Sequence, residues 1–215
     1  MQMIDTWLID LDGTLYRDTD HLYNRIYSFL ANHLGISLEH ATSLSNNYLE
    51  SYGSTLSGII NHHNIDPEYY LNTVYNNASI SHIKQNPCLQ KALSGIDGRI
   101  IVFSNSTAEY AWRVLDKLCI STEIDGVCDI RITKYHAKPH RLSFKYLLSW
   151  FGLVANSTIM IDDRATNLKQ AKKEGMHTVL CNTECAYENS SIFIDYQIDS
   201  IETGLPDLVE IVGKR

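Results

Sequence analysis

The feature that most constrains the fold is a series of short apolar segments separated by longer amphipathic ones. They cover residues 6–9, 99–103, 126–130, 157–161 and 177–181. Most are rich in β-branched residues with little polar–apolar alternation, as expected of strands buried on both faces of a parallel sheet. Helical patterns separate the later segments; Ser106 or Thr107 fits the N-cap of one, and Pro139 fits the first turn of another. This order predicts an α/β fold with an open parallel sheet flanked by helices.

The alternation breaks between the first and second predicted strands. Residues 18–86 contain several helical patterns and no convincing strand. Such a segment is far longer than a strand-to-helix connection requires. We therefore expect residues 1–17 and 87–215 to form the core. Residues 18–86 would form an α-helical cap, inserted after the first strand and placed over the carboxyl edge of the sheet.

Composition limits the classes of partner. The chain has 215 residues, 44% of them hydrophobic, and a net charge of −7, which argues against general nucleic-acid binding. Its five cysteines are scattered, no long apolar run appears in it, and we expect no signal peptide. We therefore expect a cytoplasmic protein without membrane association, either a monomer or a small homo-oligomer. Cys181 and Cys185 form the closest cysteine pair, but without a second Cys/His pair nearby they predict no zinc site.

Two carboxylates follow the first predicted strand in the stretch DLDGTLY. Asp10 and Asp12 are separated by one residue, so in an extended segment both side chains point to the same side. Two unscreened carboxylates would repel each other and raise one pKa, and a bound Mg²⁺ ion removes that penalty. Taken alone, the stretch is also explained by an Asp-Gly turn without a chemical role. The ends of the other strands decide between these interpretations.

Polar and charged side chains follow other predicted strands as well. Ser104 and Asn105 follow the second strand, and Asp162 and Asp163 follow the fourth. Lys138 precedes a helix, and the proline after it favours an extended backbone. Individually, these residues could be helix caps or solvated charges. Together they supply a nucleophile, an acid/base, metal ligands and a cation, which are the groups that phosphoryl transfer requires.

With these residues the sequence resembles the haloacid dehalogenase (HAD) superfamily of phosphatases. Four motifs carry the resemblance, which covers nearly the whole chain: DLDGTLY, Ser104 in FSNS, Lys138 in AKPH, and IDDRATNLKQAKKEGM. The resemblance implies a HAD-like Rossmannoid sheet with an inserted α-helical cap. Within the superfamily, the sequence is most similar to the pyrimidine 5′-nucleotidase-like group, through the cap stretch NNYLESYGSTLSGIINHHNIDPEYY and the segments around Ser104 and Lys138.

The resemblance implies a role for each of the four acidic residues. Asp10 would attack phosphorus and become an aspartyl phosphate. Asp12 would protonate the leaving oxygen and then activate water. A carboxylate oxygen of Asp10, the backbone carbonyl of Asp12, and Asp163 would bind Mg²⁺. Asp162 would lie next to the metal ligands and orient the waters around the metal.

The remaining implied residues bind the substrate. Ser104 and the Asn105 amide would bind phosphoryl oxygens, and Lys138 would neutralise charge on the phosphate and on the nucleophile. Tyr52 is the cap residue that we expect to reach the substrate.

The expected function is therefore Mg²⁺-dependent hydrolysis of a nucleoside monophosphate, a small phosphorylated substrate, through an aspartyl phosphate. An alternative keeps the chemistry and replaces the substrate with a sugar phosphate or a phosphoglycolate-like acid. A phospho-accepting receiver domain uses similar residues without being an enzyme. In such a domain, however, the acidic pair precedes the nucleophile and the chain is much shorter, whereas here the D-x-D stretch comes first.

Overall fold

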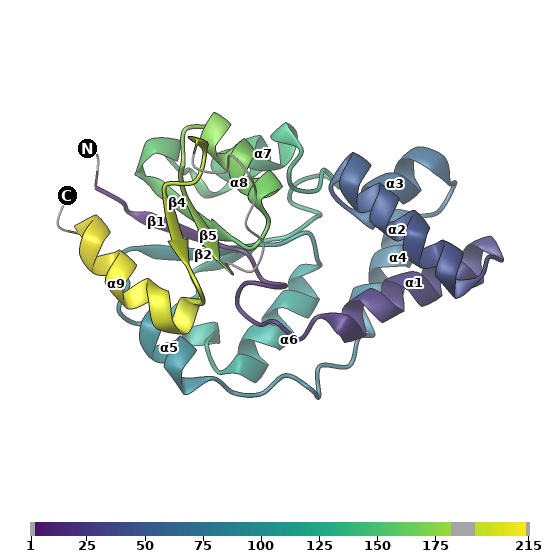
Figure 1. Cartoon of the computed structure of the whole chain (residues 1–215), viewed down its shortest axis with the longest axis horizontal. Helices are drawn as coiled ribbons and strands as arrows, with labels where there is room; N and C mark the ends of the chain where they lie inside the picture. The colour runs from purple at the N-terminus through teal and green to yellow at the C-terminus, as the bar shows by residue number, and fades with distance from the viewer. Residues whose placement is uncertain (1–2, 182–191, 214–215) are drawn as a thin grey trace.

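The computed structural model describes residues 3–181 and 192–213. The described residues contain a six-stranded parallel sheet with the strand order β3-β2-β1-β4-β5-β6 (Figure 1). The strands are β1 (Thr6–Ile9), β2 (Arg99–Phe103), β3 (Gly126–Cys128), β4 (Thr158–Asp162), β5 (His177–Cys181) and β6 (Tyr196–Ile198). The predicted α/β class with a parallel sheet is therefore confirmed.

Both faces of the sheet are buried. Because successive side chains point to opposite sides of each strand, neighbouring residues pack in different clusters. Trp7 and Ile9 of β1 belong to a hydrophobic cluster that includes side chains of α5, α6 and α9. Leu8 belongs to a second cluster that includes side chains of α7 and α8. Burial on both faces explains why these strands are mostly apolar and why they could be predicted from their composition.

The helices that flank the sheet are α5 (Pro87–Leu93), α6 (Ala108–Leu118), α7 (Arg141–Phe151), α8 (Ala165–Lys173) and α9 (Ile201–Gly213), together with the short 3₁₀ helices η2 (Ser121–Glu123) and η3 (Ala155–Ser157). Thr107 is the N-cap of α6, and its side chain accepts a hydrogen bond from the Tyr110 amide. The prediction that Pro139 lies in the first turn of α7 was wrong. His140 is the N-cap of α7, and Pro139 precedes it.

Helices α1 to η1 pack beside the sheet on the side away from both chain termini (Figure 1). They are α1 (Asp20–Leu34), α2 (Leu38–Tyr52), α3 (Thr55–His62), α4 (Pro67–Leu71) and the π-helix η1 (Asn72–Asn76). Their apolar side chains form most of a third hydrophobic cluster, which includes Leu30, Ile59 and Tyr70. This separate cluster supports our proposal that residues 18–86 form a cap on a core made of residues 1–17 and 87–215.

None of the helices in the described part of the chain has both the length and the apolar character that crossing a membrane requires. Cys181 ends β5 as a buried side chain, as expected, and Cys185 lies outside the described residues.

Candidate active site

The carboxyl ends of three neighbouring strands bring the predicted site residues together. β2, β1 and β4 are adjacent in the sheet, so the residues at their ends, Ser104, Asp10 and Asp162, share one edge. Asp10, Asp12, Ser104, Asn105 and Lys138 all line one cavity of about 90 Å³. The structure therefore places these five predicted residues around one small space.

Lys138 is the central cation of this site. Its side chain is 1% exposed, and its Nζ atom donates to Asp10 Oδ1 at 2.6 Å, to Asp162 Oδ2 at 2.9 Å and to the Phe103 carbonyl at 2.6 Å. Burial lowers the pKa of Lys138, but the Asp10 and Asp162 carboxylates outweigh burial and raise it above its usual value. The buried lysine is therefore an ammonium that holds two carboxylates in place.

Asn105 fixes the backbone on which Lys138 is carried. Its Oδ1 atom accepts from the Lys138 amide at 2.7 Å, and its Nδ2 atom donates to the Lys138 carbonyl at 3.3 Å. The Ser104 hydroxyl pairs with the Ser106 hydroxyl at 2.8 Å and accepts from the Ser106 amide at 3.0 Å. Asn105 thus connects the loop after β2 to the loop that carries Lys138, and both Ser104 and Asn105 line the cavity.

Burial also raises the pKa values of the acidic residues Asp10 and Asp163. It raises the pKa of Asp10 well above its usual range, with Lys138 opposing and the charges of Asp162 and Asp163 adding to the effect. Burial, together with the charge of Asp162, raises the pKa of Asp163 to about 7. Three crowded carboxylates lie next to a single lysine, so a further positive charge would stabilise them.

Asp163 has the geometry of a metal ligand. One oxygen each of Asp10, Asp162 and Asp163 lie within 4.8 Å of one another. The Asp163 Oδ1 atom is buried and has no hydrogen-bond partner among the described residues. Its carboxyl lies against Gly13, where φ is +97° and an added Cβ would come within 2.5 Å of Asp163 Oδ2. A divalent cation fits this donor set, because it would satisfy the unpartnered oxygen and offset the crowded charge.

The Asp162 carboxylate is hydrogen-bonded to other groups of the protein. Its Oδ1 atom accepts from the Arg164 amide at 2.9 Å, and Asn167 Nδ2 lies 3.0 Å from each carboxylate oxygen, while Lys138 donates to Oδ2. The carboxylate therefore anchors the start of α8 and orients Lys138. The sequence analysis missed the role of Asn167, although this residue lies in the stretch DDRATN.

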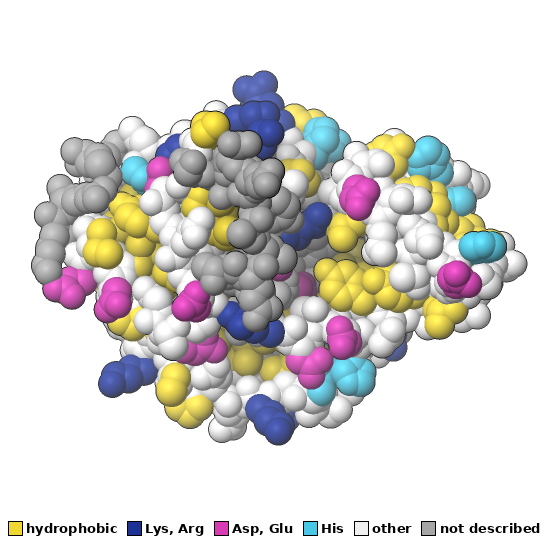
Figure 2. Space-filling view, in the orientation of Figure 1, with side chains coloured by type: hydrophobic (Ala, Val, Ile, Leu, Met, Phe, Trp, Pro, Cys, Tyr) yellow, Lys and Arg dark blue, Asp and Glu magenta, His cyan; other side chains and the backbone are white. Residues whose placement is uncertain are grey.

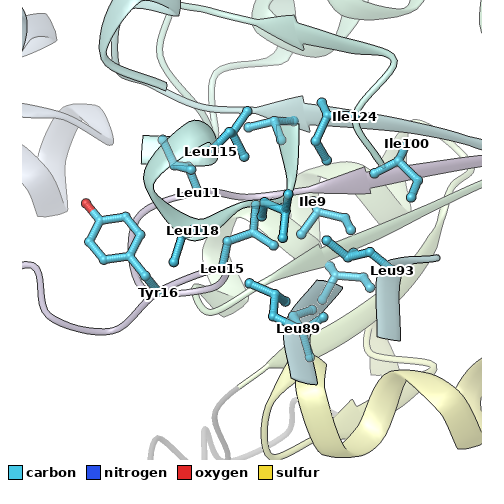
Figure 3. Close-up of a cluster of buried hydrophobic side chains, with 14 of the residues drawn as sticks. Ile9, Leu11, Leu15, Tyr16, Leu89, Leu93, Ile100, Leu115, Leu118 and Ile124 are labelled. Atoms are coloured by element: carbon cyan, nitrogen blue, oxygen red, sulfur yellow. The ribbon is translucent and has the colours of Figure 1, made fainter. Parts of the chain in front are cut away.

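Sequence reasoning also missed the partners of Asp12. The Tyr16 hydroxyl donates to Asp12 Oδ1, and the Tyr16 and Tyr110 hydroxyls are 2.6 Å apart. Figure 3 shows Tyr16 at the edge of an aliphatic cluster with its hydroxyl directed away from those side chains. Burial raises the pKa of Asp12, and the hydrogen bond from Tyr16 lowers it in part. Tyr16 lies within the quoted motif, so its spacing of four residues from Asp12 was an available signal.

Comparison with known proteins identifies the family. The family model described as haloacid dehalogenase-like hydrolase matches residues 7–181. The chain belongs to the haloacid dehalogenase-like hydrolases. It is 26% identical to the glyceraldehyde 3-phosphate phosphatase of Methanocaldococcus jannaschii, over 98% of this chain and 97% of the relative.

Solved structures agree on the fold. The crystal structure of a HAD phosphatase from Thermococcus onnurineus matches with a TM-score of 0.61 and 18% identity, covering 98% of each chain. A magnesium-bound HAD hydrolase from Bacillus subtilis matches with a TM-score of 0.63 and 14% identity, covering 98% of this chain and 99% of the other. The HAD-like Rossmannoid fold implied by the sequence motifs is therefore confirmed.

This HAD hydrolase has a second, larger hollow beside the 90 Å³ cavity. A groove of about 940 Å³ lies between α2, α3 and the loop that carries Lys138, and Leu49, Gly53 and Arg164 line both spaces. Figure 2 shows basic and acidic side chains in the depression between the helical part and the sheet. Tyr52 lines the groove rather than the cavity, and its hydroxyl is 2.6 Å from His62 Nε2.

Proposed function

We propose that this HAD hydrolase is a Mg²⁺-dependent phosphatase that cleaves a small phosphate monoester through an aspartyl phosphate. The family and the phosphatase activity named for the Methanocaldococcus relative support this reaction class. The observation that carries the proposal is the Asp10 carboxylate, which is held by the buried Lys138 ammonium at 2.6 Å in the same cavity as Asp12. This arrangement supplies a fixed nucleophile, a cation and a second carboxyl group for proton transfer.

In the first step, an oxygen of Asp10 forms a bond to phosphorus while the bond from phosphorus to the leaving oxygen breaks. Lys138 holds Asp10 Oδ1, and the Thr14 hydroxyl lies 3.3 Å from Asp10 Oδ2, so the carboxylate is oriented from both sides. Asp12 gives its proton to the leaving oxygen. In the second step Asp12 takes a proton from water, which attacks phosphorus and regenerates Asp10.

Magnesium would be held by a carboxylate oxygen of Asp10, the backbone carbonyl of Asp12, and Asp163. The unpartnered Oδ1 of Asp163 supports this assignment. When bound, the ion supplies positive charge that offsets the phosphoryl oxygens and the crowded carboxylates. Asp162 orients Lys138 and the start of α8.

The phosphoryl oxygens would bind at Ser104 and Lys138, with the Asn105 amide available once it exchanges its bond to the Lys138 carbonyl. These three residues line the same cavity as the nucleophile. The ammonium of Lys138 also offsets the charge that gathers on the transferred group.

The size of the cavity favours a small substrate. Ligand pockets for larger organic molecules usually measure roughly 300–1,000 Å³, whereas the space over Asp10 is about 90 Å³. A three-carbon sugar phosphate or a phosphoglycolate-like acid suits this space, and the relative named for glyceraldehyde 3-phosphate supports that class.

A nucleoside monophosphate is the second candidate, and the neighbouring groove favours it. The groove of about 940 Å³ is large enough for a nucleoside, and Tyr52 lines it. A nucleotide would need to cross the boundary that Gly53 and Arg164 form between the two spaces. This second candidate corresponds to the pyrimidine 5′-nucleotidase interpretation of the sequence.

A substrate panel tests the proposal. Purified protein is incubated with triose phosphates, phosphoglycolate, nucleoside monophosphates and p-nitrophenyl phosphate, each with Mg²⁺ and with EDTA, and phosphate release is measured. We expect Mg²⁺-dependent release, fastest from the three-carbon and two-carbon esters. Faster release from UMP and CMP would select the second candidate, and release from none of them would refute the phosphatase assignment.

A further inference from the structure

The turn after β1 folds Tyr16 back onto Asp12. The Gly13 amide donates to the Tyr16 carbonyl at 2.9 Å, and Asp12 and Tyr16 form an isolated parallel bridge. Tyr16 is 9% exposed and packs in the largest hydrophobic cluster of the sheet. Backbone and ring are thus both fixed, and the hydroxyl reaches the Asp12 carboxyl.

A second tyrosine completes this arrangement from a distant part of the chain. Tyr110 on α6 is 2% exposed, and its hydroxyl lies 2.6 Å from that of Tyr16. The Tyr75 ring of η1 packs edge-on against Tyr110, at 5.6 Å between ring centroids. Tyr110 therefore contacts both Tyr16 and a residue that lines the cavity.

Counting hydrogens fixes the direction of this chain. A tyrosine hydroxyl has one hydrogen to donate. Because Tyr16 gives its hydrogen to Asp12 Oδ1, Tyr110 must give its own hydrogen to the Tyr16 oxygen. The order is Tyr110 to Tyr16 to Asp12, and it leaves Asp12 Oδ2 outside this chain in a residue that lines the cavity.

We propose that Tyr16 and Tyr110 are positioning residues that hold Asp12 by Oδ1, so that Oδ2 delivers its proton to the leaving oxygen. This inference rests on the proposed phosphatase function. As the P–O bond to the leaving group breaks, the proton on Oδ2 moves to the leaving oxygen and Asp12 becomes a carboxylate that Tyr16 stabilises. In the return step Oδ2 takes a proton from the attacking water. Neither tyrosine gains or loses a proton overall.

Leaving-group dependence tests the inference. An alkyl oxygen needs a proton to leave, whereas p-nitrophenolate leaves readily without one, so misplacement of Asp12 should penalise alkyl esters selectively. The comparison uses kcat/KM, which covers the steps up to departure of the leaving group and omits the shared hydrolysis of the phospho-enzyme. The substrates are p-nitrophenyl phosphate and the alkyl phosphate that the wild-type protein hydrolyses fastest.

The variants are Tyr16→Phe and Tyr110→Phe, with Tyr48→Phe as the matched control. Tyr48 is a buried tyrosine whose hydroxyl is 2.7 Å from His63 Nε2 in the cap, away from both hollows. For Tyr16→Phe we expect a loss of about 10- to 100-fold in kcat/KM on the alkyl ester and less than about threefold on the aryl ester. Tyr110→Phe should lose about three- to tenfold, again on the alkyl ester. The control should leave the ratio unchanged.

Equal losses on both substrates, in variants whose melting temperature matches the wild type, would show that the tyrosines only support the fold. An unchanged alkyl-ester rate would also overturn the inference. If Tyr16→Phe does not fold, the Tyr110→Phe result decides the test. That variant retains the hydrogen bond between Tyr16 and Asp12. A wild-type protein that hydrolyses neither ester would instead refute the phosphatase function itself.

Discussion

The metal-free protein should lose stability as the pH rises through neutrality, because of Asp163. Its carboxyl has a usual pKa of 3.8, which burial and the charge of Asp162 raise to about 7. Between these values the folded protein retains a proton that the unfolded chain has released. Folding stability therefore falls as pH rises from about 4 to about 7, and this contribution is constant above that range.

The size of the effect follows from the pKa. One pH unit across this range corresponds to about 1.36 kcal/mol. The interval from pH 5 to the pKa of about 7 therefore corresponds to a loss of about 3 kcal/mol. Such a loss is a substantial part of the roughly 5–15 kcal/mol that stabilises an ordinary domain. The proposed Mg²⁺ would bind the ionised carboxyl, so saturating Mg²⁺ should abolish or reverse the decline.

The assay is urea unfolding at pH 5, 6, 7 and 8, in EDTA and in Mg²⁺, for wild type and Asp163→Asn. The variant has the same histidines, so the difference between the two proteins reports the Asp163 carboxyl together with its effect on the pKa of the neighbouring Asp10. We expect the wild-type free energy of unfolding in EDTA to fall by about 3 kcal/mol more than that of the variant. Parallel curves for the two proteins, or a wild-type curve that Mg²⁺ leaves unchanged, would refute this account of the acidic cluster.

Three further substitutions test the contacts around the site. Lys138→Met removes the cation from two buried carboxylates, and in EDTA at pH 8 it should lower the free energy of urea unfolding by about 3–5 kcal/mol; a loss below 1 kcal/mol would contradict the charge argument. Gly13→Ala places a Cβ 2.5 Å from Asp163 Oδ2 at a φ of +97°. We therefore expect the free energy of unfolding to fall by about 1–3 kcal/mol and calorimetry to show weaker Mg²⁺ binding. An unchanged Mg²⁺ affinity would contradict the placement of Asp163 at the metal site. Arg131→Ala breaks the partly exposed ion pairs with Glu68 at 2.9 Å and Glu109 at 2.7 Å, which should cost only about 1 kcal/mol in the same unfolding assay; a much larger loss would mean that these pairs hold the cap to the core.

The sequence was sufficient to predict strands whose burial is two-sided. β1, β2 and β5 have the predicted bounds because most of their residues are apolar and buried. The segment 126–130 was expected to be a strand, but β3 ends at Cys128, since the Asp129 carboxylate accepts from the amides of Arg131 and Ile132 and starts a turn. β6 and α9 were not predicted. β6 has three residues, and Gly204 and Pro206 lie inside α9, where both residues normally disfavour a helix.

The meeting of Asp10, Lys138 and Asp162 was predictable in outline, because parallel strands end at one edge of the sheet. The Tyr110 contact was not, because it joins residues 94 positions apart and depends on how α6 is rotated against the sheet. The cap side chains were harder to predict: several tyrosines, including Tyr70, pack inside the cap, and Tyr52 lines the groove. That Tyr52 reaches the substrate stays a prediction. Side-chain direction within a helical layer depends on packing that sequence spacing alone does not determine.

The central claim is that Asp10 becomes phosphorylated during turnover. The most direct measurement is mass spectrometry of acid-quenched protein after mixing Asp12→Asn with p-nitrophenyl phosphate in Mg²⁺, because p-nitrophenolate leaves without the proton that Asp12 otherwise supplies. Because this variant lacks the carboxyl that activates water, the account predicts one added phosphoryl group on the peptide that contains Asp10, with none in Asp10→Asn. A wild-type rate in Asp10→Asn, or a phosphoryl group found only on another peptide, would contradict it.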